Sequence, residues 1–289
     1  MQVSLSGFVD ALVSLFDLEP IDDNVFRGKS PDDDRQRVFG GQVAGQALIA
    51  AGRTVEVGRA VHSLHAYFIR PGDPKIPLLY EVERIRDGGS FSTRRVLAIQ
   101  HGRPIFNLSA SFQQDEPGPE YQAPMPDVPP PDSLPEFSKA IQESEDPMAG
   151  WYSKARPFEV RFVSEPVMGS GSVAPREPVQ QIWMRAAGTL ADDPLLHACV
   201  LAYASDMTLI DAVLLPFGKS VVDTSVFAAS LDHAMWFHRQ GRADEWFLYD
   251  MASPTSQQSR GLASGAMYDR SGRRLITVMQ EGLIRIRRP

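Results

Sequence analysis

Residues 39–51 read Phe-Gly-Gly-Gln-Val-Ala-Gly-Gln-Ala-Leu-Ile-Ala-Ala. Because nearly every position is small or apolar, the pattern predicts a helix that protein surrounds on every side. Gly40 and Gly41 leave bare backbone amides at the helix start, where the helix dipole is positive. Such an arrangement suits an oxyanion or a phosphate. Glycines that only permit close packing are the alternative, and the sequence leaves both open.

The segments around this helix have the pattern of an antiparallel meander. Four strands are expected after it, at residues 63–70, 78–86, 90–100 and 104–114, with turns at 71–74, 87–89 and 101–102. One buried helix followed by such a meander predicts an α+β fold in which the sheet wraps the helix. The second half repeats the order, with strands at 158–163 and 181–187, a helix at 195–215, and strands at 230–239, 245–252, 257–268 and 274–285.

The two halves also share residues at a nearly constant spacing. The sequence Tyr-Phe-Ile-Arg at 67–70 aligns with Trp-Phe-His-Arg at 236–239, and Gly-Arg-Pro-Ile at 102–105 aligns with Gly-Arg-Arg-Leu at 272–275. Near-equal offsets indicate a duplicated domain with insertions between the anchors. Under the second offset Gln280 corresponds to Ala110, so the second half carries a polar group that the first half lacks.

A proline-rich segment separates the halves. Residues 117–135 contain too much proline for a helix or a central strand, so this stretch is interpreted as a linker. The predicted domains are residues 1–115, a linker at 116–155, which includes a short helix at 138–151, and residues 156–289.

Composition excludes several classes of protein. The 289 residues carry a net charge of −7, which argues against a general nucleic-acid or anionic-membrane surface. Cys199 is the only cysteine, so no intrachain disulfide can form. The start of the chain lacks a secretory signal, and Asp206 and Asp211 interrupt the apolar segment at 195–217, which is interpreted as a core helix. A cytoplasmic location is the default expectation.

Three polar residues in apolar surroundings are the candidate site. Asp206 lies in an apolar helical segment, and an unpaired buried carboxylate is costly. It should therefore be paired, ionised at a cavity wall, or raised in pKa for catalysis, unless it serves as a structural cap or faces solvent. Gln280 interrupts an apolar strand, and its amide could hold a water molecule. Ser230, at the start of the strand at 230–239, adds a hydroxyl.

Other sites receive less support. His62 and His65 are three residues apart and His233 and His238 five apart, so on strands each pair points to opposite faces and forms no metal site. The sequence has no nucleophile-elbow serine motif and no phosphate-binding P-loop.

Several blocks of sequence, in order along nearly the whole chain, together resemble one family. That family is acyl-CoA thioesterase II. The blocks are Phe-Gly-Gly-Gln at 39–42, Val-His-Ser-Leu-His at 61–65, Arg-Pro-Gly-Asp at 70–73, Arg-Asp-Gly-Gly-Ser-Phe-Ser-Thr-Arg at 86–94, Ala-Ser-Asp at 204–206, Asp-His-Ala-Met-Trp-Phe-His at 232–238 and Gln-Glu-Gly at 280–282.

The resemblance implies a double hot-dog fold, α+β, with two antiparallel sheets each wrapped around a long central helix. It implies hydrolysis of fatty acyl-CoA to fatty acid and coenzyme A without a metal or other cofactor. The family's catalytic aspartate falls on Asp206, its glutamine on Gln280, and its third member, commonly threonine, on Ser230. The histidines at 233 and 238 are then expected to have structural or substrate-proximal roles.

Mechanism and partners follow as hypotheses. Asp206 would act as general base on a water held with Ser230 and Gln280, and amides at a helix start would stabilise the oxyanion. An aspartyl anhydride is the rival intermediate. The alternative functions are a hot-dog hydratase or dehydratase of 3-hydroxyacyl thioesters and a non-catalytic acyl-CoA-binding module. Association through sheet edges would give a homodimer or tetramer. Candidates to meet coenzyme A phosphates are Arg70, Lys75, Arg94, Arg95 and Arg260, and solvated salt bridges explain these residues equally well.

Overall fold

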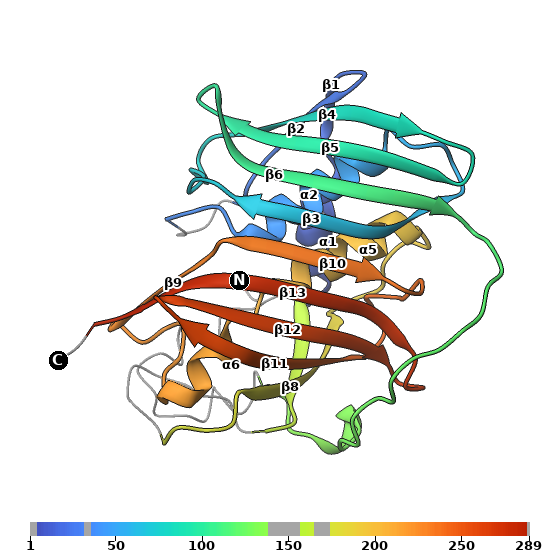
Figure 1. Cartoon of the computed structure of the whole chain (residues 1–289). Coiled ribbons are helices and arrows are strands. Elements are labelled where there is room, and N and C mark those ends of the chain that lie inside the picture. Colours follow the sequence, from blue (N-terminus) through green and yellow to red (C-terminus); the bar gives the residue numbers. More distant parts are fainter. Residues whose placement is uncertain (1–4, 32–35, 138–156, 165–173, 288–289) are drawn as a thin grey trace.

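The computed structural model describes residues 5–31, 36–137, 157–164 and 174–287 (Figure 1). The helices are α1 (Leu5–Phe16), α2 (Gly40–Gly52), α5 (Pro194–Ser205) and α6 (Asp211–Leu214), with 3-10 turns η1 (Pro131–Ser133) and η2 (Leu215–Phe217). The first-half strands are β1 (Glu19–Asp22), β2 (Val25–Gly28), β3 (Arg59–Phe68), β4 (Leu78–Asp87), β5 (Phe91–Gln100) and β6 (Arg103–Gln114). The second-half strands are β7 (Phe158–Phe162), β8 (Val179–Ala186), β9 (Val226–Ser230), β10 (Asp232–Phe237), β11 (Phe247–Gln257), β12 (Arg260–Asp269) and β13 (Arg274–Ile286).

The strands of the described residues form one continuous antiparallel sheet. Its order is β1-β2-β4-β5-β6-β3-β10-β13-β12-β11-β8-β7, with β9 also paired to β13. Outward from the central β3–β10 pair the two halves repeat the same order, which agrees with the predicted duplication. Gly102 and Gly272, at equivalent hairpin turns, both have positive φ, at 67° and 83°. The two separate sheets expected from the sequence are thus joined edge to edge, and Figure 1 shows β3 and β10 side by side.

Most predicted elements are present, and three differ. The hairpin β1–β2 was missed because its strands have four residues each and β1 is exposed along its whole length. The prediction of a single helix at 195–215 is wrong, since α5 ends at Ser205 and a turn separates it from α6. The strand expected at 230–239 is divided at Leu231 into β9 and β10.

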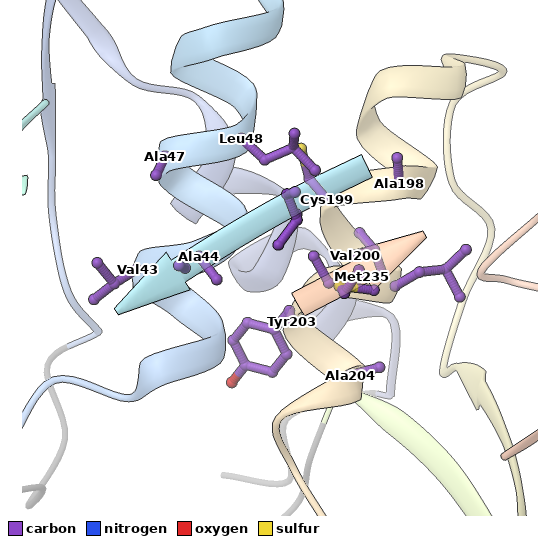
Figure 2. Packing of buried hydrophobic residues seen from close by; sticks show 14 of the residues in the cluster. Val43, Ala44, Ala47, Leu48, Ala198, Cys199, Val200, Tyr203, Ala204 and Met235 are labelled. Carbon is purple, nitrogen blue, oxygen red and sulfur yellow. The ribbon is translucent and has the colours of Figure 1, made fainter. Parts of the chain in front are cut away.

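The core is built around α2 and α5, which lie side by side and antiparallel under β3 and β10 (Figure 2). Glycine allows the close approach: a Cβ on Gly41 would lie 2.5 Å from the Tyr203 carbonyl oxygen, and one on Gly45 would lie 3.0 Å from that of Cys199. Residues 41–51 of α2 are all buried, as the sequence predicted. The N-terminal end of α2 therefore meets the C-terminal end of α5.

The described part of the proline-rich segment packs on the second half of the sheet. Trp183 Nε1 donates a hydrogen bond of 2.9 Å to the Pro129 carbonyl oxygen. Met125, Val128 and Leu134 pack against the buried cluster around this tryptophan. The segment has no strand, and its only helical piece among the described residues is η1. The short helix expected at 138–151 lies outside the described residues. Among the described residues, no helix is long and apolar enough to cross a membrane.

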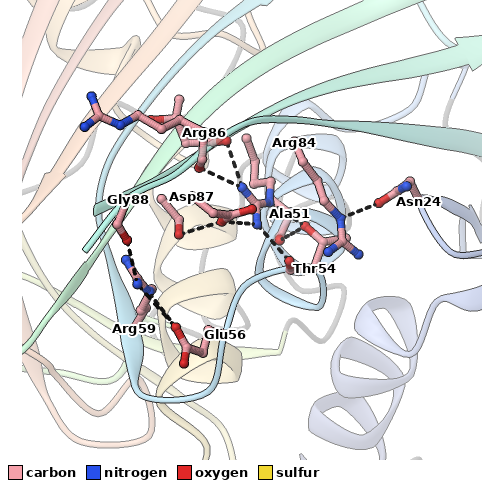
Figure 3. A network of polar contacts seen from close by, with 12 residues as sticks. Asn24, Ala51, Thr54, Glu56, Arg59, Arg84, Arg86, Asp87 and Gly88 are labelled. Atoms are coloured by element: carbon pink, nitrogen blue, oxygen red, sulfur yellow. Dashed lines mark hydrogen bonds and ion pairs between the residues drawn. The ribbon is translucent and has the colours of Figure 1, made fainter. Parts of the chain in front are cut away.

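A network of polar contacts that includes Thr54, Arg86 and Asp87 joins the segment after α2 to the first-half sheet (Figure 3). Its central donor is Arg94. The Arg94 side chain is 1% exposed, and Nε donates to Thr54 Oγ1 at 2.9 Å. Nη2 donates to the Thr54 carbonyl oxygen at 2.9 Å and to Asp87 Oδ1 at 2.6 Å, and Nη1 donates to the carbonyl oxygens of Arg86 and Thr93. The guanidinium thus satisfies backbone and side-chain acceptors that few other residues could reach together.

Replacing Arg94 with leucine should lower the free energy of unfolding by about 2–4 kcal/mol, because buried acceptors lose their donors. The matched control is Arg95→Leu, on the same strand, where an exposed ion pair with Glu83 is lost. That change should cost less than about 1 kcal/mol. Urea unfolding of both variants measures the difference, and equal losses would contradict a structural role for the Arg94 network.

Candidate active site

Asp206 lies at the end of α5, where it is the C-cap residue with φ −89° and ψ −1°. The sequence placed it on the apolar face of a longer helix, which is wrong because α5 ends one residue earlier. Residues 206–210 form a turn between α5 and α6. Asp206 as a residue is half-buried, whereas α5 itself is buried from Leu196 to Ser205.

An irregularity between β9 and β10 aligns the strand residues with this carboxylate. Ser230 pairs with Gly282 while Ala234 pairs with Met279, so four residues along β9–β10 are matched by three along β13. One extra residue in a strand is a β-bulge, which re-aims the side chains beside it. As a result Ser230 and His233, three residues apart, both face the same side of the sheet as Gln280.

The backbone around this bulge is fully engaged. The Leu231 amide donates to the Glu281 carbonyl oxygen at 2.9 Å, and its carbonyl oxygen accepts from the Phe68 amide at 2.9 Å. The Asp232 carboxylate accepts from the Glu281 amide at 2.7 Å. These bonds tie the bulge to β13 and to the first-half strand β3, so the position of Ser230 is held by both halves of the chain.

The three residues predicted from the sequence meet at one carboxylate oxygen. Gln280 Nε2 donates to Asp206 Oδ1 at 2.7 Å and to Ser230 Oγ at 2.6 Å. Ser230 Oγ in turn donates to Asp206 Oδ1 at 3.1 Å. Gln280 is 1% exposed, whereas Asp206 and Ser230 keep accessible surface. Gln280 therefore contacts Asp206 and Ser230 from the buried side of the site. A role in holding water would expect a solvent-exposed amide, and the Gln280 amide is buried.

The first turn of α2 closes the other side of the site. The Gly41 backbone amide donates a hydrogen bond to the Asp206 carboxylate. A Cβ on Gly40 would lie 2.5 Å from Asp206 Oδ2 and 2.8 Å from the Phe68 ring. Gly40 and Gly41 thus permit close packing, and the Gly41 amide also donates to an anion, the Asp206 carboxylate.

Burial decides the electrostatics of the carboxylate. Desolvation raises the pKa of Asp206 above its usual value, although the nearby His233 and the hydrogen bonds from Gln280, Ser230 and the Gly41 amide act in the opposite direction. A carboxylate with a raised pKa is a stronger base than an ordinary one.

His233 is a contact that the sequence did not predict. It is 1% exposed, and Nδ1 lies 3.1 Å from Gln280 Oε1. His238 is exposed instead and bonds to Thr277 Oγ1 through Nε2 at 2.8 Å, so the two histidines face opposite sides as predicted. The only signal for His233 was its place in an alternating apolar strand next to Met235, and alternation alone does not identify the partner across the sheet.

The basic residues named from the sequence differ in availability. Arg94 is enclosed in its internal network and is therefore excluded as a phosphate ligand. Arg95 and Arg260 form exposed ion pairs with Glu83 and Glu281. In the described part of the chain, no group of three or more histidine, cysteine, aspartate or glutamate side chains is arranged to hold a metal ion.

Two family models match the chain. Residues 155–283 match the family described as acyl-CoA thioesterase, and residues 30–113 match the acyl-CoA thioesterase N-terminal domain. Asp206, Ser230 and Gln280 lie within the first match, and Gly40 and Gly41 lie within the second. The site at the junction of α2 and α5 thus combines residues from both matched regions.

Full-length relatives agree with these matches. The chain is 44% identical to acyl-coenzyme A thioesterase 8 of Mus musculus over 98% of this chain and 92% of that protein. It is 38% identical to acyl-CoA thioesterase 2 of Haemophilus influenzae over 97% of this chain and 99% of that protein. The crystal structure of acyl-CoA thioesterase II TesB2 from Mycobacterium marinum is 42% identical, with a TM-score of 0.74 over 95% of this chain and 98% of that one. The chain therefore belongs to the acyl-CoA thioesterase family.

Proposed function

We propose that this protein hydrolyses fatty acyl-CoA thioesters to fatty acid and coenzyme A, with Asp206 as the general base. The observation that carries the proposal is the convergence of Ser230 Oγ and Gln280 Nε2 on Asp206 Oδ1, next to the N-terminal end of α2. A binding module would not require a desolvated carboxylate held by three donors in an apolar region.

The reaction follows from this arrangement. Asp206 removes a proton from a water molecule, and the water oxygen attacks the thioester carbonyl carbon. The carbonyl oxygen becomes an oxyanion, which the positive N-terminal end of α2 stabilises. When the tetrahedral intermediate collapses, the carbon–sulfur bond breaks, and protonated Asp206 returns the proton to the departing thiolate. Ser230 and Gln280 hold the carboxylate in position throughout.

We further infer that the two halves are hot-dog units, with residues 1–115 around α2, residues 156–289 around α5, and a linker at 116–155. The repeated strand order on either side of β3 and β10 supports this division. In this interpretation the β3–β10 pairing takes the place of the dimer contact between two separate units. Association of whole chains into a homodimer or tetramer, and a cytoplasmic location, remain part of the proposal.

A free-thiol assay tests the function directly. Incubation with palmitoyl-CoA should release coenzyme A thiol, and Asp206→Asn should lower kcat by about 10²–10⁴-fold because the base is lost. Asp250→Asn, on β11 and paired with Gln181, is the control and should keep near-normal turnover. A hydratase, a dehydratase or a binding module would release no thiol. Normal turnover in a folded Asp206→Asn variant would show that the base is elsewhere.

The pH dependence tests the role of the hydroxyl. The Ser230 hydrogen bond favours ionised Asp206, so Ser230→Ala should raise the pKa of that carboxyl further. Since only the ionised form acts as a base, activity is lost as the pH falls through this pKa, and the acid limb of kcat/KM should move to higher pH. Ser230→Thr keeps the hydroxyl and should retain the wild-type limb. A limb that stays in place in Ser230→Ala would contradict the assignment.

Isotope labelling separates direct water attack from the anhydride route. A single turnover in water enriched in oxygen-18 should label the fatty acid and leave the Asp206 carboxylate unlabelled, because the base never bonds to the acyl carbon. Mass spectrometry of the peptide that contains Asp206 makes the measurement. Label in this carboxylate would require attack by Asp206 itself and hydrolysis of the anhydride at the aspartyl carbonyl.

A further inference from the structure

A chain of buried hydrogen bonds continues behind the proposed site. Gln280 Oε1 lies 3.1 Å from His233 Nδ1, and His233 Nε2 lies 2.8 Å from Ser205 Oγ. Ser205 is completely buried at the end of α5, directly before Asp206. The Tyr249 hydroxyl donates to the Ser205 carbonyl oxygen at 2.9 Å, which holds this last turn against β11. The described contacts thus lead from the helix end through the imidazole to the amide and back to the carboxylate.

The orientation of the Gln280 amide decides whether its nitrogen can donate to both Asp206 and Ser230. In the observed orientation both N–H groups are used, one on Asp206 and one on Ser230. A rotation by half a turn would place Oε1 against the ionised carboxylate and would leave Asp206 without its closest donor. Because the amide oxygen and nitrogen are nearly equal in size, packing alone cannot select between the two orientations. A hydrogen-bond donor facing Oε1 can.

His233 is suited to be that donor. Burial lowers the pKa of its imidazole, and the opposing effects of Asp206, Gln280 and Asp232 are smaller, so the ring is neutral at physiological pH. A neutral imidazole carries one N–H and one lone pair. With the proton on Nδ1, the ring donates to Gln280 Oε1. Nε2 and the Ala202 carbonyl oxygen, 2.8 and 2.9 Å from Ser205 Oγ, are then alternative acceptors for the single Ser205 hydroxyl proton.

We propose that His233 is a positioning residue for catalysis, and that its Nδ1–H locks the Gln280 amide with both N–H groups directed at Asp206 and Ser230. This inference rests on the proposed function of the three residues. His233 is 1% exposed and lies behind Gln280, so the positioning effect is transmitted through the glutamine amide. Ser205 has a supporting role, since its hydroxyl contacts Nε2 at 2.8 Å and holds the ring in place.

Turnover of palmitoyl-CoA by substituted enzymes tests the proposal. His233→Leu removes the donor and should lower kcat by about 10–100-fold, the loss that is usual for a group that orients a functional residue. KM should change less than about threefold, because no substrate contact is lost. His233→Asn places a side-chain N–H near the position of Nδ1 and should recover most of the turnover. His238→Leu, at the exposed end of the same strand segment, is the control and should match the wild type.

The double variant distinguishes positioning from a general structural role. In a Gln280→Ala background there is no amide to orient, so adding His233→Leu should change kcat by less than about twofold. Damage to the fold would lower kcat again in that background. Ser205→Ala is a milder change that leaves the imidazole in place. It should lower kcat in the wild-type background and be silent beside Gln280→Ala, which keeps the test valid if His233→Leu does not fold.

The outcomes separate failure of this inference from failure of the proposed function. If Gln280→Ala keeps wild-type turnover, the assignment of the three-residue site is wrong, and the positioning role is overturned with it. If Gln280→Ala is impaired but His233→Leu is not, only the role of His233 is overturned. The same conclusion follows if the losses of Gln280→Ala and His233→Leu multiply in the double variant.

Discussion

The close antiparallel approach of α2 and α5 is the contact on which the rest of the structure depends. Glycine at positions 41 and 45 lets the α2 backbone reach the carbonyl oxygens of Tyr203 and Cys199 on α5. A side chain there would push the helices apart, because backbone atoms cannot move aside as a flexible side chain can. The approach brings the positive N-terminal end of α2 to the negative C-terminal end of α5, which is where Asp206 lies.

This geometry offsets the cost of a largely desolvated carboxylate. A carboxylate at the C-terminal end of its own helix is in an unfavourable field, and burial disfavours its ionised form further. The Gly41 amide at the start of α2, together with Gln280 and Ser230, provides donors that oppose both effects. The same donors that make the folded state tolerate the charge also hold it in place for the proposed reaction. Structure and function at this position therefore depend on the same hydrogen bonds.

In each half, one long polar side chain lies opposite an alanine on the neighbouring strand, but the two side chains have different partners. In the first half Arg94 on β5 faces Ala110 on β6, and in the second half Gln280 on β13 faces Ala263 on β12. Arg94 donates to Thr54, just after α2, and to Arg86, Asp87 and Thr93 in the sheet, so its guanidinium is enclosed by these acceptors. Gln280 is shorter and donates to Asp206 and Ser230, so the polar side chains of the candidate site come from the second half.

The sequence by itself determined the buried helix, most of the strands, the internal repeat, the family resemblance and the three candidate site residues. These depend on local patterns of apolar residues, on turn residues, and on recognisable blocks such as residues 204–206 and 232–238. Only the tertiary structure decided that α5 ends before Asp206, that a bulge turns Ser230 and His233 to one face, and that Gln280 lies between His233 and the carboxylate. The physical reason is that strand register and helix ends depend on partners distant in the sequence. A shift of one residue reverses which side chains face the core.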